Sequence, residues 1–243
     1  MGRVILFSIG SINVYTHGLF FVLAVLISAI VLFYISRSFS KNNTIALDLV
    51  SWSLISGIIV ARILYIAIYF DQFHSFSDYI NLSKGGLVSW GGYAGGLLVA
   101  YLIIKQEKEN LKKWMDAIFI SGMLGITIGR IGCILSGELA GKSYTGLFNI
   151  LGKYPTTLLE AALTLLIFLV IYFFYREKKG YDGFWWKLSL ALYAIGRFFI
   201  DFTRDEAVYY LRFSLGQILS LIVFLVLVIL IIFEVKKRGK YVG

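Results

Sequence analysis

Charged side chains interrupt stretches of the sequence that are otherwise apolar enough to span a membrane. An arginine at the centre of a membrane helix costs about 2.5–3.5 kcal/mol on insertion scales, so a chain that keeps several of them is expected to use them. Guanidinium groups stay protonated and offer a fork of donors that suits phosphate oxygens, and lipid phosphate is the commonest anion in a bilayer. These residue types therefore indicate an intramembrane anion site. The residues are Arg62, Arg130, Arg197 and Arg204, accompanied by Asp116, Glu138, Glu160 and Asp201.

The composition is that of a polytopic integral membrane protein. Of the 243 residues, 59% are hydrophobic and only 15% are charged, and the mean hydropathy is +0.82. Soluble domains carry about 25% charged residues. We predict an all-α fold in one membrane-embedded domain, 1–243. The single cysteine, Cys133, excludes an intramolecular disulfide and a multi-cysteine metal site, and two histidines make a histidine-based metal cluster unexpected. We therefore expect no metal and no cofactor.

Seven apolar segments of about 20 residues each fit a hydrocarbon core of about 30 Å. Lysine and arginine cluster after the first, third, fifth and seventh segments, so the positive-inside rule places the N-terminus outside and the C-terminus in the cytoplasm. The net charge of +9 is thus a signal of topology and not of nucleic-acid binding. No internal repeat is visible, which disfavours an inverted-repeat transporter. The predicted spans are 17–35, 45–70, 86–104, 114–135, 156–175, 184–202 and 215–233.

Glycines crowd two stretches of the chain, 85–96 and 129–141. Glycine in a membrane helix lets two backbones approach closely. At this density it is also typical of broken or re-entrant backbone, which is tolerated only against protein or water. Both interpretations stay open, and the position of Arg130 and Glu138 within the second stretch favours a lipid-accessible cavity.

Purely structural roles are open to several of the charged residues. Asp201 lies four residues after Arg197 and three before Arg204, so the three can pair along one helix. Such an ion-pair network explains these residues as well as a phosphate site does. Glu160 is expected to be hydrogen-bonded near the outer end of its span. Asp116 lies at the cytoplasmic start of another, where a negative charge at a helix N-terminus is favourable. Arg62 has no acidic neighbour in its own span, which favours a functional role.

The segment 129–141 reads G-R-I-G-C-I-L-S-G-E-L-A-G and resembles G-R-x-G-N-F-x-N-x-E, the signature of the prolipoprotein diacylglyceryl transferase family. Further family motifs have counterparts in the same order, so the resemblance covers almost the whole chain. These counterparts are F-S-I-G with H-G-L-F (7–10 and 17–20), A-R-I-L-Y (61–65), G-G-L-V-S-W-G-G (85–92), Y-P-T-T-L-L-E (154–160), G-R-F-F-I-D-F-T-R (196–204) and S-L-G-Q-I-L-S (214–220).

The resemblance implies an activity. The family transfers diacylglycerol from phosphatidylglycerol to the cysteine thiol that follows the signal peptide of a prolipoprotein, and glycerol phosphate is released. It also implies an integral protein of the bacterial cytoplasmic (inner) membrane. The implied partners are phosphatidylglycerol, the signal-peptide region of a prolipoprotein and membrane lipids, with no nucleic acid. Seven spans with an outside N-terminus suit this family.

The resemblance also implies the roles of individual residues. Arg130 and Arg197 match essential arginines of the family and are expected to stabilise the charge that gathers on the leaving phosphate. Glu138 matches the signature carboxylate, which either orients an arginine or receives the thiol proton. Gly92 and Gly141 match functional glycines of the family and are expected to leave room for the lipid. The predicted substrate-binding residues are Arg62, Gly91, Gly92, Gly141, Asp201 and Arg204.

Four positions depart from the family pattern. Trp90 stands where the family has the histidine most often cast as the thiol base, and tryptophan cannot accept a proton. Cys133 and Ser136 replace the two signature asparagines, and His17 replaces a tyrosine. Cys133 beside Arg130 is either a reactive thiol or a small buried apolar residue.

These departures raise the hypothesis that His17 supplies the missing imidazole, whose ordinary pKa of about 6.5 suits thiol deprotonation. The alternative is that His17 only forms a hydrogen bond at the outer membrane surface. At the level of the whole protein, two other functions remain open, a lipid-binding paralogue without activity and a small-anion transporter.

Overall fold

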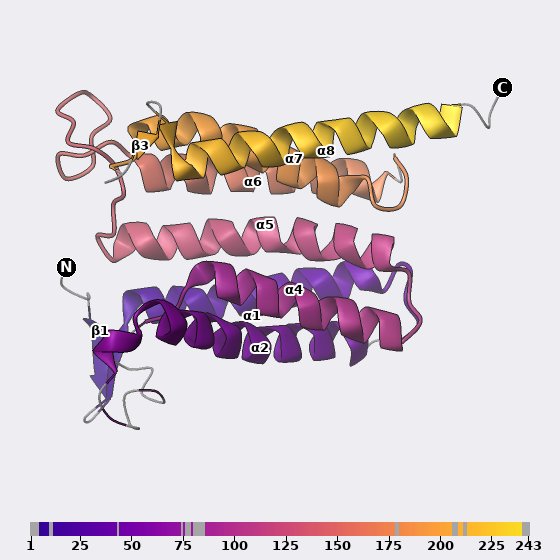
Figure 1. The fold of residues 1–243 in the computed structure, drawn as a ribbon, viewed down its shortest axis with the longest axis horizontal. Coiled ribbons are helices and arrows are strands. Elements are labelled where there is room, and N and C mark those ends of the chain that lie inside the picture. Colours follow the sequence, from indigo (N-terminus) through magenta and orange to yellow (C-terminus); the bar gives the residue numbers. More distant parts are fainter. Residues whose placement is uncertain are drawn as a thin grey trace. The chain divides into compact units, whose positions relative to one another are not determined.

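The computed structural model describes residues 5–9, 12–42, 44–73, 75, 79, 86–177, 180–205, 209–210 and 213–239. Long helices dominate this part of the chain, and each coincides with one of the predicted spans to within a few residues (Figure 1). They are α1 (Thr16–Ser36), α2 (Thr44–Ile68), α4 (Ser89–Gln106), α5 (Leu111–Leu135), α6 (Thr156–Arg176), α7 (Trp185–Ile200) and α8 (Leu215–Gly239).

The helices are those of an integral membrane protein. By length and composition, α1, α2, α5, α6 and α8 can cross a bilayer. The helix α4 has 18 residues and a glycine-rich first half, and α7 has 16 residues with Lys187 and Arg197 among them. The 3-10 helix η3 (Asp201–Thr203) follows α7 directly and lengthens it towards the predicted span. Large apolar side chains such as Ile30 and Phe233 are strongly exposed on the helices, as expected for surfaces that face lipid.

The chain divides into two compact units, Met1–Leu32 with Met115–Gly243, and Phe33–Trp114. In the first unit α7 packs against both α6 and α8 (Figure 1). The carboxylate of Asp116 on α5 accepts hydrogen bonds from the backbone N–H groups of Gly183 and Trp186, at 2.7 and 2.8 Å. Asp116 therefore accepts hydrogen bonds at the N-terminus of α7, and not at the N-terminus of its own helix as the sequence led us to expect.

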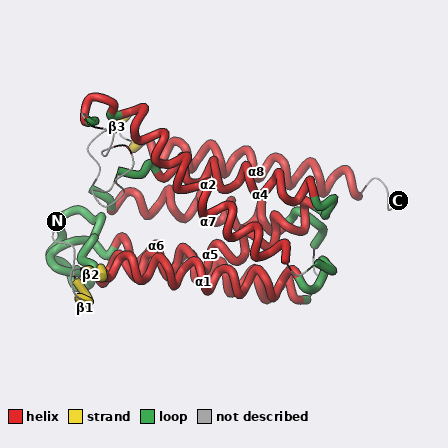
Figure 2. Tube along the Cα trace, turned by 90° about the horizontal axis from the view of Figure 1, so that it is seen from below, coloured by secondary structure: helices red, strands yellow, loops and turns green. Residues whose placement is uncertain are grey.

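In the second unit the glycines of 91–96 bring α4 against α2. A Cβ atom on Gly91 would lie 2.8 Å from the Cα of Ala61, and one on Gly95 would lie 2.8 Å from the backbone oxygen of Ser56. The helix α4 runs through all of these glycines without a break (Figure 2). Tight packing is therefore the correct interpretation of residues 91–96, and re-entrant backbone is wrong for them.

The glycines of the second stretch serve two purposes in the first unit. Gly132 lies within α5, and a Cβ atom there would collide with the side chain of Phe20 on α1. Gly137 has a φ of 73°, a left-handed conformation that favours glycine, and it lies just after α5 ends. The stretch thus brings α1 close to α5 and then turns the chain.

Two short antiparallel hairpins accompany the helices and were not predicted. The strands β1 (Ile5–Ile9) and β2 (Ile12–Tyr15) pair directly before α1, and β3 (Tyr209–Tyr210) pairs with β4 (Phe213–Ser214) directly before α8. The first hairpin leads the chain into α1 two residues before His17.

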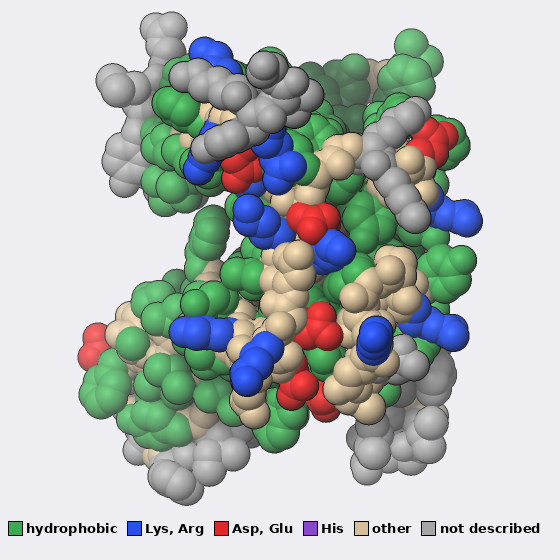
Figure 3. Space-filling model, turned by 90° about the vertical axis from the view of Figure 1, so that its right-hand side faces the viewer, with side chains coloured by type: hydrophobic (Ala, Val, Ile, Leu, Met, Phe, Trp, Pro, Cys, Tyr) green, Lys and Arg blue, Asp and Glu red, His purple; other side chains and the backbone are tan. Residues whose placement is uncertain are grey.

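Basic side chains gather at one end of each unit. In the first unit Lys187 at the start of α7 pairs with Glu234 near the end of α8 at 2.5 Å, and the guanidinium of Arg238 lies over the ring of Tyr181. Figure 3 looks onto the end of the molecule where α8 terminates and shows Lys and Arg side chains there. In the second unit Ser40, which follows Arg37, donates a hydrogen bond to Glu109 in the lysine-rich segment before α5. The predicted orientation itself stays a prediction.

Candidate active site

A buried carboxylate, that of Glu160 on α6, holds three arginines of the first unit together. Its Oε2 atom lies 2.8 Å from Nε of Arg130 on α5. Its Oε1 atom lies 3.5 Å from Nη1 of Arg197 on α7 and also pairs with Nη2 of Arg204. The Glu160 side chain is only 1% exposed. Arginines from three different segments thus converge on one anion.

Asp201 is the second buried carboxylate of this cluster. Its Oδ1 atom accepts a hydrogen bond of 3.0 Å from Nε of Arg204, and its Oδ2 atom lies 3.7 Å from Nε of Arg197. The expected pairing of Asp201 with both arginines is therefore present. Arg197 also donates a hydrogen bond of 3.1 Å to the hydroxyl of Tyr193, which orients its guanidinium further.

The charges of this cluster do not cancel. Three guanidinium groups face two carboxylates, which leaves one net positive charge on the five side chains. The side chains of Arg130 and Arg197 remain 28% and 24% exposed, so both can be reached from outside the cluster. Arginine is suited to planar, two-pronged contacts with phosphate oxygens. The cluster is thus an ion-pair network whose excess charge and accessible donors suit an anion.

Backbone hydrogen bonds fix the segment that carries Arg204 to the segment that follows α5. Gly141 and Arg204 form an isolated antiparallel bridge, and the amide of Lys142 donates to the carbonyl of Thr203 at 2.9 Å. A Cβ atom on Gly141 would meet the carbonyl of Tyr154 and the hydroxyl of Thr156. The expectation that Gly141 leaves room for lipid is therefore wrong, because protein atoms already take that space.

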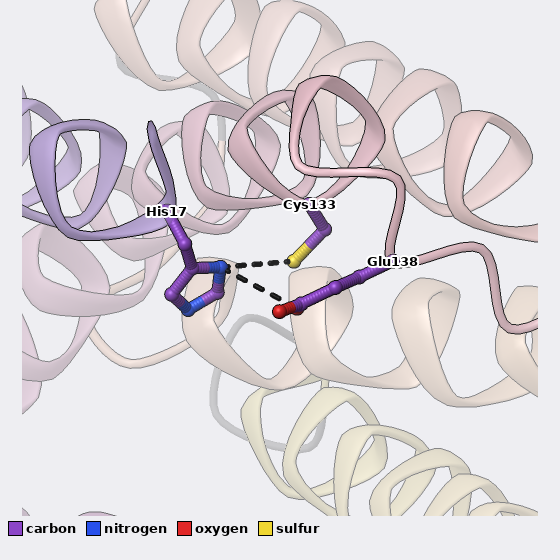
Figure 4. A group of neighbouring side chains, drawn as sticks. All are labelled: His17, Cys133 and Glu138. Atoms are coloured by element: carbon purple, nitrogen blue, oxygen red, sulfur yellow. Dashed lines mark hydrogen bonds and ion pairs between the residues drawn. The ribbon is translucent and has the colours of Figure 1, made fainter. Parts of the chain in front are cut away.

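A second group of side chains lies where α1 begins and α5 ends (Figure 4). The Nδ1 atom of His17 lies 3.5 Å from Oε2 of Glu138 and 3.7 Å from the sulfur of Cys133. About half of each of the His17 and Glu138 side chains is exposed, whereas Cys133 is partly buried. The structure thus places the imidazole proposed from the sequence directly beside the signature carboxylate.

The two groups are neighbours through α5. Arg130 lies one helical turn before Cys133, and its guanidinium is close enough to interact with the thiol. A reacting sulfur beside His17 would therefore lie near the arginine cluster. This arrangement is what transfer of an alkyl group from a phosphate ester to a thiol requires, namely cations for the leaving group and a proton acceptor for the nucleophile.

Three predicted site residues belong to the second unit. Arg62 is buried on α2 and donates hydrogen bonds to the carbonyls of Tyr79 (3.2 Å) and Gly86 (3.0 Å). Gly91 meets the backbone of α2, and Gly92 has more space, with its nearest neighbours at ordinary contact distance. Trp90 lies in the first turn of α4 with 70% of its surface exposed. Contacts of Arg62, Gly91 and Gly92 with substrate stay a prediction.

Glu160 is the site residue that sequence reasoning undervalued. We expected an ordinary hydrogen bond, and the structure instead makes it the common partner of three arginines. Its motif, Y-P-T-T-L-L-E, was recognised, and a lone carboxylate in an apolar segment is itself a signal, because burial of an unpaired charge is costly. The sequence does not show how α5, α6 and α7 are rotated relative to one another, and this rotation decides which of their side chains meet.

The fold and the cluster define a polytopic helical membrane protein with buried, paired arginines and carboxylates. The model of the prolipoprotein diacylglyceryl transferase family matches residues 4–233. The chain therefore belongs to this family, and the resemblance noted in the sequence is confirmed.

Individual relatives agree with this assignment. Phosphatidylglycerol–prolipoprotein diacylglyceryl transferase 1 of Clostridium perfringens is 30% identical over 252 residues, with 96% of each chain covered. The similarly named enzyme of Campylobacter hominis is 33% identical, with 88% of this chain and 84% of the relative covered. That of Finegoldia magna is 26% identical, with 92% of each chain covered. The similarity thus covers between 84% and 96% of each of these relatives.

Proposed function

We propose that this protein transfers diacylglycerol from phosphatidylglycerol to the cysteine thiol of a prolipoprotein. The observation that carries the proposal is the cluster of three arginines on two buried carboxylates, with one positive charge in excess and Arg130 and Arg197 still accessible. Family membership supplies the reaction, since the relatives are named for it. We place the protein in the bacterial cytoplasmic membrane with this cluster at the outer end of the helices.

In the proposed reaction the thiolate sulfur attacks the terminal glycerol carbon of the diacylglycerol unit. A carbon–sulfur bond forms as the carbon–oxygen bond to phosphate breaks, and the oxygen leaves with the electron pair as glycerol phosphate. Arg130 and Arg197 contact the phosphate and stabilise the charge that develops there. Glu160 holds both guanidinium groups in place before the lipid arrives, so little reorganisation is needed during reaction.

The thiol proton needs an acceptor, and Trp90 cannot provide one. We assign this role to His17, whose Nδ1 atom lies 3.5 Å from a carboxylate oxygen of Glu138, so that Nε2 is the nitrogen that accepts the proton. A carboxylate beside an imidazole orients the ring and stabilises the imidazolium that forms, as in other acid–base pairs. Both members of the pair are half exposed, which leaves the substrate thiol room to approach.

The remaining predicted residues take supporting roles in this proposal. Asp201 and Arg204 position the guanidinium of Arg197 and the carboxylate of Glu160, and Gly141 holds the backbone that carries Arg204. Arg62, Gly91 and Gly92 are proposed contacts for the lipid. The signal-peptide region of the prolipoprotein approaches from the outer face.

The test is a transfer assay with the purified protein in vesicles that contain phosphatidylglycerol, to which a lipobox peptide is added. We expect release of glycerol phosphate together with a matching gain of mass on the peptide cysteine. Arg130→Lys and Arg197→Lys should each lower the rate by about 100-fold, because lysine lacks the planar fork of donors.

Arg176→Lys, at the exposed far end of α6, is the matched control and should keep the full rate. Phosphatidylglycerol binding without any glycerol phosphate release would identify a lipid-binding paralogue instead, and anion uptake into the vesicles would identify a transporter. Either result overturns the proposal.

A further inference from the structure

Three potential metal ligands meet in the group of Figure 4. The Nδ1 atom of His17 lies 3.7 Å from the sulfur of Cys133 and 3.5 Å from a carboxylate oxygen of Glu138. The three ligand atoms all lie within 4.8 Å of one another. Among the described residues this is the one group of His, Cys and acidic side chains with such spacing. It is unexpected for a chain with one cysteine and two histidines.

These separations are close to those of a tetrahedral zinc site. Zinc lies about 2.0–2.3 Å from nitrogen, oxygen and sulfur ligands, so two ligands on a tetrahedron are about 3.3–3.8 Å apart. The two separations from His17 already fall in this interval. The third separation, between Cys133 and Glu138, is at most 4.8 Å, and the Glu138 side chain is half exposed and so has space to move closer.

The backbone around the three residues is firmly held. Close approach of Gly132 on α5 to Phe20 on α1 fixes the two helices that carry Cys133 and His17. The amide of Glu138 donates to the carbonyl of Cys133 at 2.9 Å, and the hydroxyl of Thr157 donates to the carbonyl of Glu138 at 3.3 Å. Ligands on a rigid frame lose little freedom when a metal binds.

The chemistry of the three ligands favours zinc over other common metal ions. Imidazole, thiolate and carboxylate together are zinc ligands, whereas Ca²⁺ and Mg²⁺ take oxygen ligands. Two of the three residues are among the four positions where this chain departs from the family pattern, with His17 in place of tyrosine and Cys133 in place of asparagine. Both departures replace a side chain that rarely binds zinc by one that binds it well, and the structure brings the two together.

We propose that His17, Cys133 and Glu138 form a Zn²⁺ site, and that zinc bound there reversibly inhibits lipid transfer. On binding, the Cys133 thiol releases its proton to water and the metal takes the lone pair of the imidazole. With the metal on Nδ1, the ring proton lies on Nε2, so neither ring nitrogen can accept the proton of a substrate thiol. The metal site stands on geometry alone, and only the inhibitory effect rests on the proposed function.

The first experiment detects the site without using activity. The protein is stripped with EDTA, returned to chelator-free detergent and titrated with Co²⁺, which reports thiolate ligation through a charge-transfer absorption in the near ultraviolet. We expect this band at one equivalent and its loss on adding Zn²⁺, which binds such sites more tightly than Co²⁺. Cys133→Asn and His17→Phe should lack the band, whereas Glu107→Gln, an exposed carboxylate on another segment, should keep it.

The second experiment measures inhibition. Zn²⁺ should lower the rate of glycerol phosphate release at least tenfold, and EDTA should restore it. Cys133→Asn, which returns the family residue, should keep the basal rate and resist Zn²⁺. Absence of the cobalt band, or its persistence in Cys133→Asn, overturns the metal site. A band without inhibition overturns the regulatory role, and a band in a protein without transferase activity overturns the proposed function alone.

Discussion

At the scale of single residues, Glu160 gives the arginine cluster its form. Pairing in a buried ion pair rarely adds much net stability, because both charges lose their hydration. Glu160 instead fixes the geometry of the cluster, because its one carboxylate aligns guanidinium groups that would otherwise repel one another. The cluster keeps a net positive charge only because three cations share two anions, and this is the condition for binding a phosphate.

Replacement of Glu160 tests that role. Glu160→Gln keeps the volume but removes the charge that three guanidinium groups face, so we expect a loss of about 3–5 kcal/mol in stability. Thermal unfolding in detergent should shift to clearly lower temperature. Glu107→Gln, an exposed carboxylate, serves as the control and should leave the transition unchanged. An unchanged transition in Glu160→Gln would show that the arginines do not depend on this carboxylate.

The role of His17 as proton acceptor gives the second prediction. His17→Phe removes the imidazole beside Glu138 and should lower the transfer rate by about 100- to 10,000-fold, the usual range for loss of a general base. The assay is run in EDTA, so that bound metal does not contribute. Turnover equal to that of the unchanged protein would remove His17 from the mechanism, and an equal melting temperature of the two proteins would exclude misfolding as the cause of a slower rate.

At the scale of elements, the helix pairs that form each unit are set by small residues. In α4 the glycines lie along the line of contact with α2, where backbone atoms of the two helices nearly touch. In membranes, where lipid competes with apolar side chains for contact, such close packing is a principal source of association between helices.

Gly95 offers a direct test of this packing. A Cβ atom there would lie 2.8 Å from the backbone oxygen of Ser56 and 2.7 Å from a methyl carbon of Val60. Gly95→Ala should therefore cost about 1–3 kcal/mol by overpacking, seen as a lower melting temperature. Gly122→Ala in α5 is the matched control, because no atom lies within 4 Å of its added Cβ, and its stability should stay equal or rise. Equal effects of the two substitutions would contradict the packing argument.

At the scale of the whole molecule, hydropathy alone predicted where the helices lie. In lipid a single segment can satisfy all its backbone hydrogen bonds internally only as a helix. The predicted span 156–175 and the helix α6, for example, differ by one residue. Local spacing also predicted the pairing of Asp201 with Arg197 and Arg204. What local spacing could not provide was contact between distant segments.

Three features of the structure could not be predicted from the sequence. Arg62 donates to backbone carbonyls, which every residue has. No pattern of side chains in the sequence could therefore reveal these partners. The strands β1 and β2 mix polar and apolar residues and are too short for their sequence to be distinguished from that of a loop. Asp116 was placed at the start of its own helix, but the hydrogen-bond donors it accepts from belong to a segment about 70 residues away.

The orientation in the membrane rests on the distribution of positive charge. Each unit has a group of basic side chains at one end. The arginine cluster, paired with carboxylates, belongs with His17 and Glu138 to the other end of the first unit, where α1 and α6 begin and α5 and α7 end. The positive-inside rule then predicts that the loop between α5 and α6 faces outward and the segment between α4 and α5 faces the cytoplasm. This orientation is required by the proposed function, because the acceptor is an exported protein.

Single-cysteine variants can measure this orientation. In a Cys133→Ser background, Leu147→Cys places a thiol at a site that is 97% exposed in the loop between α5 and α6, and Glu107→Cys places one between α4 and α5. A membrane-impermeant maleimide should label the first variant in intact spheroplasts and the second only after the membrane is permeabilised. The opposite pattern would put the arginine cluster on the cytoplasmic side, where a newly exported lipobox cysteine could not reach it, and the proposed acceptor would have to be abandoned.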